Sequence, residues 1–374
     1  MSRVRFCLLC LISMSACSNE VAGPVPASVA SARSRSFVAS TPVVVMSGLN
    51  SPRGLSFGPE GGLYVAEAGT SAITGPCIPF LEGPTLNTKC YSGTGSVSRL
   101  WKGSQTRVVT GLASTFIVQS GFASGPQDIS FSGRGNAIVA IGWGGDPALR
   151  PGLGEAANTA GSLIQLQPGG TWRVVADVSA FESATNPAGG AIDSNPYGVL
   201  AEGSRTFVTD AGGNSLVEVT ANGVISLVAI FPGTAAPPPF NQSEAVPTRV
   251  KRGPDGALYV STLTGAPFLA GSAAIYRVVP GQSPAVYLGG FKTITDFAFA
   301  RDGSLYVLQF ATATVFFGGP GALIHVATNG VRTTITTDLF QPTGVVVGPD
   351  GSVYVSNRGT SSGGGEVLKI TELE

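Results

Sequence analysis

A short motif recurs six times along the chain and limits its fold more than any other feature of the sequence. Each copy places a tight, glycine-containing turn before an aromatic or aliphatic residue that is followed by valine. The six pairs are Tyr64-Val65, Ile138-Val139, Phe207-Val208, Tyr259-Val260, Tyr306-Val307 and Tyr354-Val355. Self-similarity at this spacing is typical of repeat architectures, in which each unit buries its apolar surface against its neighbours.

Each repeat predicts four short strands. In the third repeat the expected strands are residues 197–201, 205–209, 215–220 and 224–230. Asn222-Gly223 suits the last hairpin, because both residues tolerate positive φ. Four strands repeated six times predict an all-β fold, a six-bladed β-propeller with four-stranded antiparallel blades. A stacked solenoid is the structural alternative.

The two ends of the repeat region complement each other and argue against the solenoid. The last repeat stops after its third strand, residues 366–370, whereas residues 43–46 form an extra strand before the first repeat. We expect these two strands to pair and close the ring, because closure removes exposed sheet edges at which proteins aggregate. The propeller domain would then occupy residues 43–374.

The first residues predict export. Arg3 and Arg5 precede a mostly apolar stretch that is too short to span a bilayer, as in a signal peptide. The stretch ends in Met14-Ser15-Ala16-Cys17, which resembles the lipobox of bacterial lipoproteins. We therefore expect a signal peptide over residues 1–16, then lipidated Cys17 and a flexible tether over residues 17–42. An ordinary secretory signal that is cleaved nearby is the alternative.

Composition agrees with a folded, exported protein whose only membrane contact is its lipid. Ser18 replaces the Asp that often retains lipoproteins at the inner membrane, which favours the outer membrane, facing the periplasm or the surface. The chain is 43% hydrophobic and 12% charged, which is too apolar for disorder. Its 22 basic and 22 acidic residues include no basic run, so nucleic acid is not an expected partner.

Two cysteines, Cys77 and Cys90, are left once the signal peptide and Cys17 are set aside. They flank residues 78–89, which show no strand periodicity. An oxidising compartment would let them close this loop as a disulfide. A metal site is the alternative, but no histidine or further cysteine lies nearby in the sequence.

The connections between the predicted strands are unequal. Hairpins from first to second strand and from third to fourth strand are tight, whereas the long connections gather on the opposite face of a propeller. These long connections are residues 69–95, 111–125, 144–161, 176–195, 231–246, 265–273 and 311–321. Long loops on a rigid scaffold often carry function, so we expect this long-loop face to bind a small molecule, a glycan or a protein.

Alignment of the first strands places three charged residues, Asp128, Arg249 and Asp296, at one height near the mouth of the predicted channel. We call these the axial positions; glycine occupies them in the other three repeats. Arg53 and Tyr197 stand one residue earlier in their strands and are further ligand-binding candidates. Charges gathered here must pair with one another, with a ligand or with an ion, because unpaired burial is costly.

A second set of polar residues, the strand-end positions, closes the second strands and includes Glu67, Asp210 and Asn357. These residues open the loops of the long-loop face and could contact a ligand. Asp210 and Asn214 resemble the Asp…Asn signature of NHL-type blades, whose side chains usually satisfy turn amides. Trp143 could stack against a sugar or an aromatic ligand, or pack between blades.

The chain contains a distinctive stretch, Phe181-Glu182 … Asn186-Pro187 … Gly189-Gly190 … Asp193-Ser194-Asn195-Pro196-Tyr197-Gly198, followed by Asp210-Ala-Gly-Gly-Asn214. This stretch resembles the ScyD/ScyE family, which is named for genes that accompany scytonemin pigment biosynthesis. Residues 49–55 and 341–345 look like the same family, and the resemblance covers about residues 42–371. It implies an exported, six-bladed propeller similar to NHL and gluconolactonase-like proteins, and it implies no particular activity.

We expect a non-catalytic binding or assembly module, because no nucleophile set is recognisable. The alternative is a metal-dependent hydrolase resembling gluconolactonases, which hold a divalent cation through oxygen atoms at the channel mouth. Calcium or another divalent cation could be bound by Glu67, Asp128, Asp210, Asp296 or Asn357. Arg249 opposes this alternative, because it occupies an axial position that would carry a ligand.

Histidine-dependent chemistry is disfavoured by composition. His325 is the single histidine and lies in a predicted third strand, away from the channel. Quinoprotein dehydrogenases, which are also six-bladed, and serine–histidine hydrolases are therefore not expected.

The lipid anchor can be tested by replacing Cys17 with serine. We expect Cys17→Ser to move the protein from the membrane fraction to the soluble fraction, because the lipid loses its attachment site. Cys10→Ser, inside the predicted signal peptide, should leave it in membranes. Immunoblots of fractionated cells measure both variants, and a membrane-bound Cys17→Ser protein would rule out lipidation as the anchor.

Overall fold

The computed structural model describes residues 38–39, 41–82, 85–133, 135–313 and 319–373, all of which belong to one compact unit, residues 37–374. The predicted signal peptide and Cys17 lie outside the described residues. No helix among these ranges has the length and apolar character that crossing a bilayer requires. At the end of the predicted tether, strand β1 (Val38–Ala39) pairs with β32 (Glu372–Leu373).

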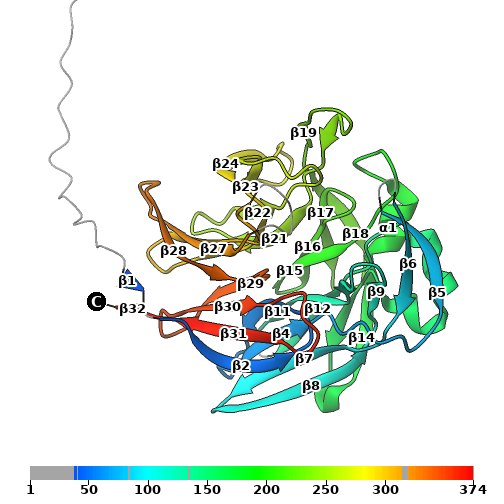
Figure 1. Cartoon of the computed structure of the whole chain (residues 1–374), viewed down its shortest axis with the longest axis horizontal. Helices are drawn as coiled ribbons and strands as arrows, with labels where there is room; N and C mark the ends of the chain where they lie inside the picture. The colour runs from blue at the N-terminus through cyan, green and yellow to red at the C-terminus, as the bar shows by residue number, and fades with distance from the viewer. Residues whose placement is uncertain (1–37, 40, 83–84, 134, 314–318, 374) are drawn as a thin grey trace, which may run out of the picture. The chain divides into compact units, whose positions relative to one another are not determined.

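Five four-stranded antiparallel sheets follow the first five repeats in chain order (Figure 1). The first sheet contains β3 (Pro52–Phe57), β4 (Leu63–Glu67), β7 (Gly95–Trp101) and β8 (Ser104–Leu112), and the second contains β11 (Pro126–Ser132), β12 (Asn136–Ile141), β13 (Ser162–Leu166) and β14 (Trp172–Asp177). The third sheet contains β15 (Pro196–Glu202), β16 (Arg205–Asp210), β17 (Ser215–Thr220) and β18 (Ile225–Ile230), and the fourth contains β21 (Pro247–Arg252), β22 (Leu258–Thr262), β23 (Ala273–Val278) and β24 (Ala285–Phe291). The fifth sheet contains β25 (Ile294–Phe299), β26 (Leu305–Gln309), β27 (Gly321–Val326) and β28 (Arg332–Leu339). The four strands predicted in the third repeat are confirmed.

The sixth sheet joins the two ends of the folded unit. It consists of β29 (Gly344–Val347), β30 (Val353–Asn357), β31 (Gly365–Ile370) and β2 (Val43–Leu49). Val43 lies opposite Lys369, and Met46 lies opposite Val367. The N-terminal strand therefore forms the outer edge of the sheet that the C-terminal repeat builds.

The repeated motif supplies both the core of each sheet and the contact between sheets. Its valine is fully buried in every repeat: Val65, Val139, Val208, Val260, Val307 and Val355. Burying one such side chain is worth about 1.5–3 kcal/mol. The preceding aromatic residue packs on the first strand of the next sheet, as Tyr64 does on Phe131 with 4.8 Å between ring centroids.

Threonine hydroxyls bind neighbouring first strands to one another. Thr248, Thr295 and Thr343 occupy equivalent places in the fourth, fifth and sixth repeats. Each hydroxyl donates to a backbone carbonyl of the following repeat: Thr248 to Ile294 at 3.0 Å, Thr295 to Pro342 at 3.0 Å, and Thr343 to Pro52 at 2.7 Å. The last bond links the sixth repeat with the first.

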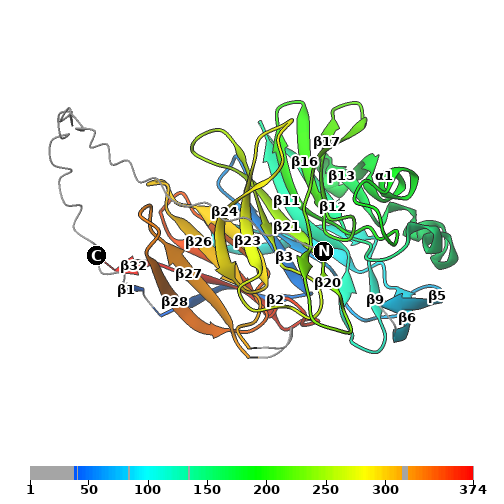
Figure 2. The ribbon, with the colours of Figure 1, turned by 90° about the horizontal axis from the view of Figure 1, so that it is seen from above.

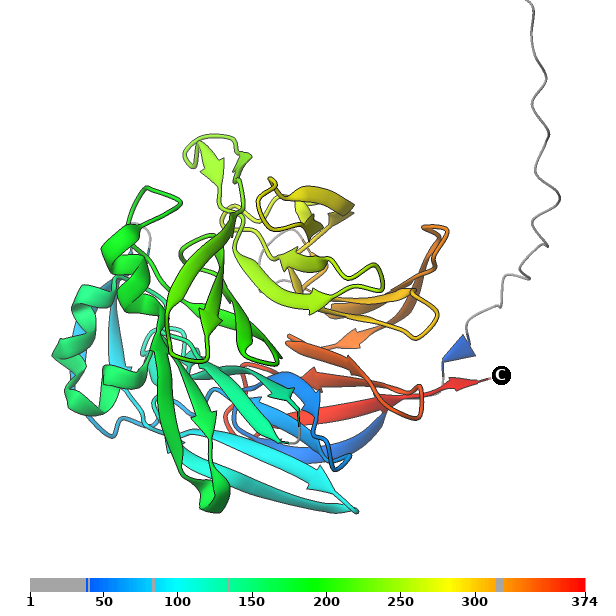
Figure 3. The same cartoon turned by 180° about the vertical axis from the view of Figure 1, so that it is seen from behind.

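The long connections fold into structure of their own. Four strands pair in the order β10-β9-β6-β5 and form what we call the appended sheet: β5 (Cys77–Glu82), β6 (Thr85–Tyr91), β9 (Thr115–Ile117) and β10 (Ala123–Ser124). Other long connections contain 3-10 helices η1 (Pro147–Leu153) and η2 (Glu155–Thr159), helix α1 (Val178–Thr185), and the pair β19 (Thr234–Ala235) and β20 (Gln242–Ser243). The tight hairpin between β13 and β14 contains the short 3-10 helix η3 (Pro168–Gly170). The appended sheet and α1 lie on the same side of the folded unit (Figures 2 and 3).

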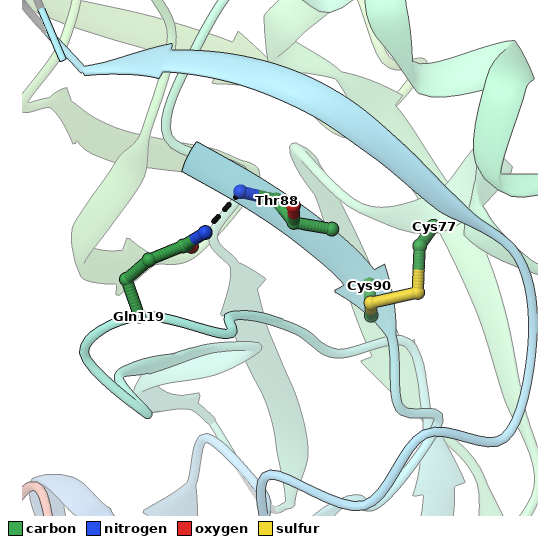
Figure 4. Close-up of a disulfide and its surroundings, with 4 residues drawn as sticks. All are labelled: Cys77, Thr88, Cys90 and Gln119. Carbon is green, nitrogen blue, oxygen red and sulfur yellow. Dashed lines mark hydrogen bonds between the residues drawn. A yellow bond between two sulfur atoms is a disulfide. The ribbon is translucent and has the colours of Figure 1, made fainter. Parts of the chain in front are cut away.

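The expectation that residues 78–89 lack strand structure is wrong. Cys77 lies directly opposite Cys90 in the β5–β6 hairpin, and the predicted disulfide joins them (Figure 4). Thr88 of β6 donates its backbone N–H to Gln119 Oε1 at 2.9 Å, which holds the neighbouring loop against the hairpin. The usual burial pattern is inverted here, because Lys89 is buried and Leu86 is exposed, so hydrophobicity gives no strand signal.

Candidate functional site

The three axial charges form a buried cluster. The guanidinium of Arg249 in β21 lies between Asp128 of β11 and Asp296 of β25, with Nη1–Oδ2 and Nε–Oδ2 distances of 3.4 and 3.2 Å. Lys251 Nζ lies 3.9 Å from the other oxygen of Asp296. Burial raises the pKa of Asp128, against the opposing effect of Arg249. Although burial disfavours its charge, the two carboxylates raise the pKa of Arg249 above its ordinary value.

The remaining donors of Arg249 reach further strands. Its Nη1 donates to the carbonyls of Gln127 and Tyr197 at 3.2 and 3.3 Å, and its Nη2 donates to that of Thr343 at 3.2 Å. The guanidinium also lies over the Tyr197 ring, 4.8 Å from its centroid. One side chain therefore connects first-strand segments of five repeats, including those of its two aspartate partners and its own.

Glycines at the other axial positions let a charge or a neighbouring strand approach the backbone closely. A Cβ atom on Gly54 would lie 1.9 Å from Asp128 Oδ1, and one on Gly198 would lie 2.4 Å from the carbonyl oxygen of Thr248. Both distances are far below van der Waals contact, so a larger residue would displace a charge or a strand.

Arg53 of β3 is a second buried cation near this cluster. Its Nε donates to Gln127 Oε1 at 2.9 Å, its Nη2 donates to the carbonyl of Ala123 at 2.9 Å, and its Nη1 donates to that of Gly359. Burial lowers the pKa of Arg53 from its ordinary value. The side chain ties β3 to the second repeat, to the appended sheet and to the loop between β30 and β31 in the sixth repeat.

The strand-end residues clamp the chain where it enters a sheet. In three repeats a side-chain oxygen accepts a backbone N–H from this entry: Glu67 from Asn50 at 2.6 Å, Gln309 from Lys292 at 2.8 Å, and Asn357 from Phe340 at 2.7 Å. Glu67 is fully buried and also accepts from Ser98 Oγ at 2.5 Å and from Arg107, whose Nη2 lies 2.9 Å from Oε2.

Asp210 makes the equivalent clamp in the third repeat. Its Oδ1 accepts the N–H groups of Asn195 and Gly213 at 2.6 and 3.1 Å, and its Oδ2 accepts from Ser194 Oγ at 2.7 Å. Asn214 Oδ1 accepts a backbone N–H from the connection to the fourth sheet at 2.9 Å. Both side chains satisfy turn amides, the role that the NHL-like signature predicts. Burial raises the pKa of Asp210 to about 6.

Trp143 has no exposed surface and cannot offer its ring to a ligand on the long-loop face. Lys89 of β6 covers it, because its Nζ donates to the Trp143 carbonyl at 3.0 Å and lies 4.4 Å from a Trp143 ring centroid. The same ammonium group lies 3.9 Å from the centroid of the Phe80 ring. Trp143 is therefore a packing residue beneath the appended sheet and not a stacking surface for a ligand.

The oxygens expected to bind a divalent cation are already engaged. Asp128 and Asp296 contact Arg249, Glu67 contacts an arginine, and Asp210 accepts three hydrogen bonds. Throughout the part of the chain that the structure describes, no three His, Cys, Asp or Glu side chains are grouped so that they could hold a metal ion. The axial residues therefore do not fit calcium, which would have to displace a guanidinium.

Two buried charges, Lys89 and Glu182, carry no repeat signal, because they lie in insertions that other repeats lack. Each side chain is 2% exposed. Alignment of repeats cannot find such residues. For Glu182 the available signal is its place in the Phe181-Glu182 stretch that resembles the ScyD/ScyE family.

Comparison with known proteins gives a fold and no family. No family model matches the sequence, and no functionally curated protein matches it. A streptogramin B lyase structure is similar, with 14% identity, a TM-score of 0.50, and coverage of 90% of this chain and 98% of the lyase.

Two further solved structures reach the same TM-score of 0.50. A candidate oxidoreductase (glucose dehydrogenase) from Thermus thermophilus is 17% identical, with coverage of 90% of this chain and 100% of that one. An auxiliary nutrient binding protein from Bacteroides thetaiotaomicron is 10% identical, with coverage of 87% and 70%. At such identities the likeness shows the fold alone, and this fold is a β-propeller.

The clamp role of Glu67 can be tested by truncation. Glu67→Ala should lower the free energy of unfolding by about 3 kcal/mol, because buried donors lose their acceptor. Glu60 forms an ion pair with Arg99 and is more exposed than Glu67, so Glu60→Ala should lower the free energy of unfolding by less than about 1 kcal/mol. Urea denaturation measures both variants. If millimolar calcium stabilised the wild-type protein but not Glu67→Ala, Glu67 would be a metal ligand instead.

Proposed function

We propose that the six sheets close into a six-bladed propeller on an exported lipoprotein, and that this propeller is a non-catalytic module for binding or assembly. The pairing of β2 with β31 and the bond from Thr343 to Pro52 support the closed ring. The Arg249 cluster supports a non-catalytic centre, because its carboxylates are engaged with a guanidinium and are poor general acids, bases or metal ligands.

The observation that carries the binding role is the two-sided appended sheet. Its inner face buries Phe80, Asn87 and Lys89. Its outer face presents Leu81 and Leu86, which lie directly opposite each other and are 64% and 67% exposed. Part of this outer face is covered, because Cys90 and Phe116 are buried there, but the apolar pair Leu81 and Leu86 is open to water and suited to receive a partner.

The partner that this outer face fits best is a protein. Leu81, Leu86 and the exposed Pro79 are aliphatic, whereas glycan sites usually present an aromatic ring, and Trp143 is buried. Strand β5 is also the edge strand of the appended sheet, which a strand of the partner can join beside Pro79. The disulfide between β5 and β6 keeps this surface ordered before binding, which lowers the entropic cost of association.

Membership of the ScyD/ScyE family is part of the same proposal. The propeller fold and the quoted stretch around residues 181–198 support it, and neither assigns an activity. The lipobox-like sequence ending at Cys17 supports a tethered position at the outer membrane, where a protein-binding surface would act on other envelope or exported proteins.

Acidic substitutions on the outer face test the binding role. We expect Leu81→Glu/Leu86→Glu to abolish the complex that the wild-type protein forms in the exported fraction, because two charges would be buried at the interface. Val224→Glu/Val331→Glu, at exposed apolar positions in other hairpins, should leave it intact. Native mass spectrometry of the affinity-purified protein, with and without chelator, identifies the partner, including a second copy of the chain.

The proposal would be wrong if both double variants kept the same complex. It would also be wrong if the wild-type protein hydrolysed lactones with a divalent cation and Asp296→Ala abolished this turnover, since the axial cluster would then be catalytic.

A further inference from the structure

Glu182 in α1 is a buried carboxyl group with one oxygen that lacks a hydrogen-bond donor. The side chain is 2% exposed, and its Oε2 accepts no hydrogen bond from the residues that the structure describes. A Cβ atom on Gly213 would lie 2.6 Å from this oxygen and 3.2 Å from Cγ of Asp210. Glu182 and Asp210 therefore face each other across a glycine that has no side chain to separate them.

A third carboxylate borders the same turn. Asp193 Oδ1 would lie 2.5 Å from a Cβ atom on Gly212. Asp193 accepts the N–H of Gly145 at 2.7 Å, and Asp210 accepts three donors, so both of these groups are compensated. Of these three carboxyl groups, Glu182 alone combines two acidic neighbours with an Oε2 that no described donor reaches.

Basic residues around α1 do not neutralise Glu182. Lys89 of β6 acts on Asp193 and is bonded to backbone carbonyls. Arg150 of η1 is held 2.7 Å from the Asp177 carboxylate that caps α1. The charged groups that act on Glu182 are thus Asp210 and Asp193, and both oppose its ionisation.

The protonation of Glu182 follows from this setting. Burial, with Asp210 and Asp193 adding to it, raises the pKa of Glu182 to about 7. A neutral carboxyl group can lie beside an ionised one, whereas two buried carboxylates repel each other. Glu182 therefore titrates nearest to neutral pH, above Asp210, whose pKa is about 6.

Hydrogen bonds connect α1 to the third sheet at the same place. Ser179 Oγ of α1 donates to Ser194 Oγ at 2.8 Å, and Ser194 Oγ donates to Asp210 Oδ2 at 2.7 Å. Any movement that separates Glu182 from Asp210 must strain this relay. The contact between α1 and the connection to β15 thus lies beside the carboxyl group of Glu182.

We propose that Glu182 is a proton-dependent latch: its neutral carboxyl group lets α1 pack beside Asp210, and its ionised form loosens α1 and residues 186–195. The latch lies in α1 and not on the outer face of the appended sheet, so this inference does not depend on the identity of the binding partner. Because the folded protein binds this proton more tightly than the unfolded chain, the stabilisation is complete in acid and is lost as pH rises through about 7.

Thermal unfolding and hydrogen exchange at about pH 5 and about pH 8 test the latch. For the wild-type protein we expect a lower melting temperature at the higher pH, and faster exchange in residues 178–195 after correction for the intrinsic pH dependence. Glu182→Gln, which keeps the shape and removes the charge, should remove most of both pH effects and melt higher than wild type at about pH 8. The part that remains should come from Asp210, whose pKa is about 6. Glu155→Gln, at an exposed position in η2, should behave as wild type.

Two results would overturn the latch. The first is a Glu182→Gln variant with the wild-type pH dependence, which would show that ionisation of Glu182 does not affect stability. A variant less stable than wild type at both pH values would count equally, because it would show that the carboxyl group itself is required. The second is a calcium-induced rise in the wild-type melting temperature at about pH 8 that Glu182→Gln lacks, since a cation and not a proton would then neutralise the three carboxylates.

Discussion

The ion pairs of Arg249 with Asp128 and Asp296 are the contact on which the rest of the arrangement depends. Three sheets contribute one charge each, and further donors of the same guanidinium bind carbonyls of two more repeats. Because the charges are buried, removing any one of them would weaken the compensation of its partners and would destabilise the fold. Glycine at position 54 is a consequence, because a side chain there would collide with Asp128 and Arg249.

Around this centre the same few devices repeat. A motif valine fills each sheet, hydroxyl groups such as that of Thr343 bind the next first strand, and strand-end residues such as Glu67 clamp the entering chain. The polar side chains at the axial and strand-end positions are therefore engaged in hydrogen bonds and ion pairs that hold the fold together. The insertions differ, because the appended sheet exposes Leu86 and α1 carries an uncompensated Glu182.

Repetition explains what the sequence predicts well. Equivalent positions share one register, so the strands of the third repeat, the strand at residues 43–46 and the convergence of Asp128, Arg249 and Asp296 follow from alignment. That these charges pair with one another depends on distances, which alignment does not contain. The appended sheet escapes prediction for another reason: Lys89 points inward, held by carbonyls and aromatic rings, while Leu86 points outward, so alternation misleads.

The most direct test compares the free energy of unfolding of Arg249→Met with that of Arg249→Met/Asp128→Asn/Asp296→Asn. If the cluster is a structural hub, the single substitution should cost about 3–5 kcal/mol, because it leaves buried Asp128 without its cation and Asp296 with only the more distant Lys251. The triple variant should recover most of this loss, because its amides carry no charge. A single variant as stable as the wild-type protein, or a triple variant no more stable than the single one, would contradict the account.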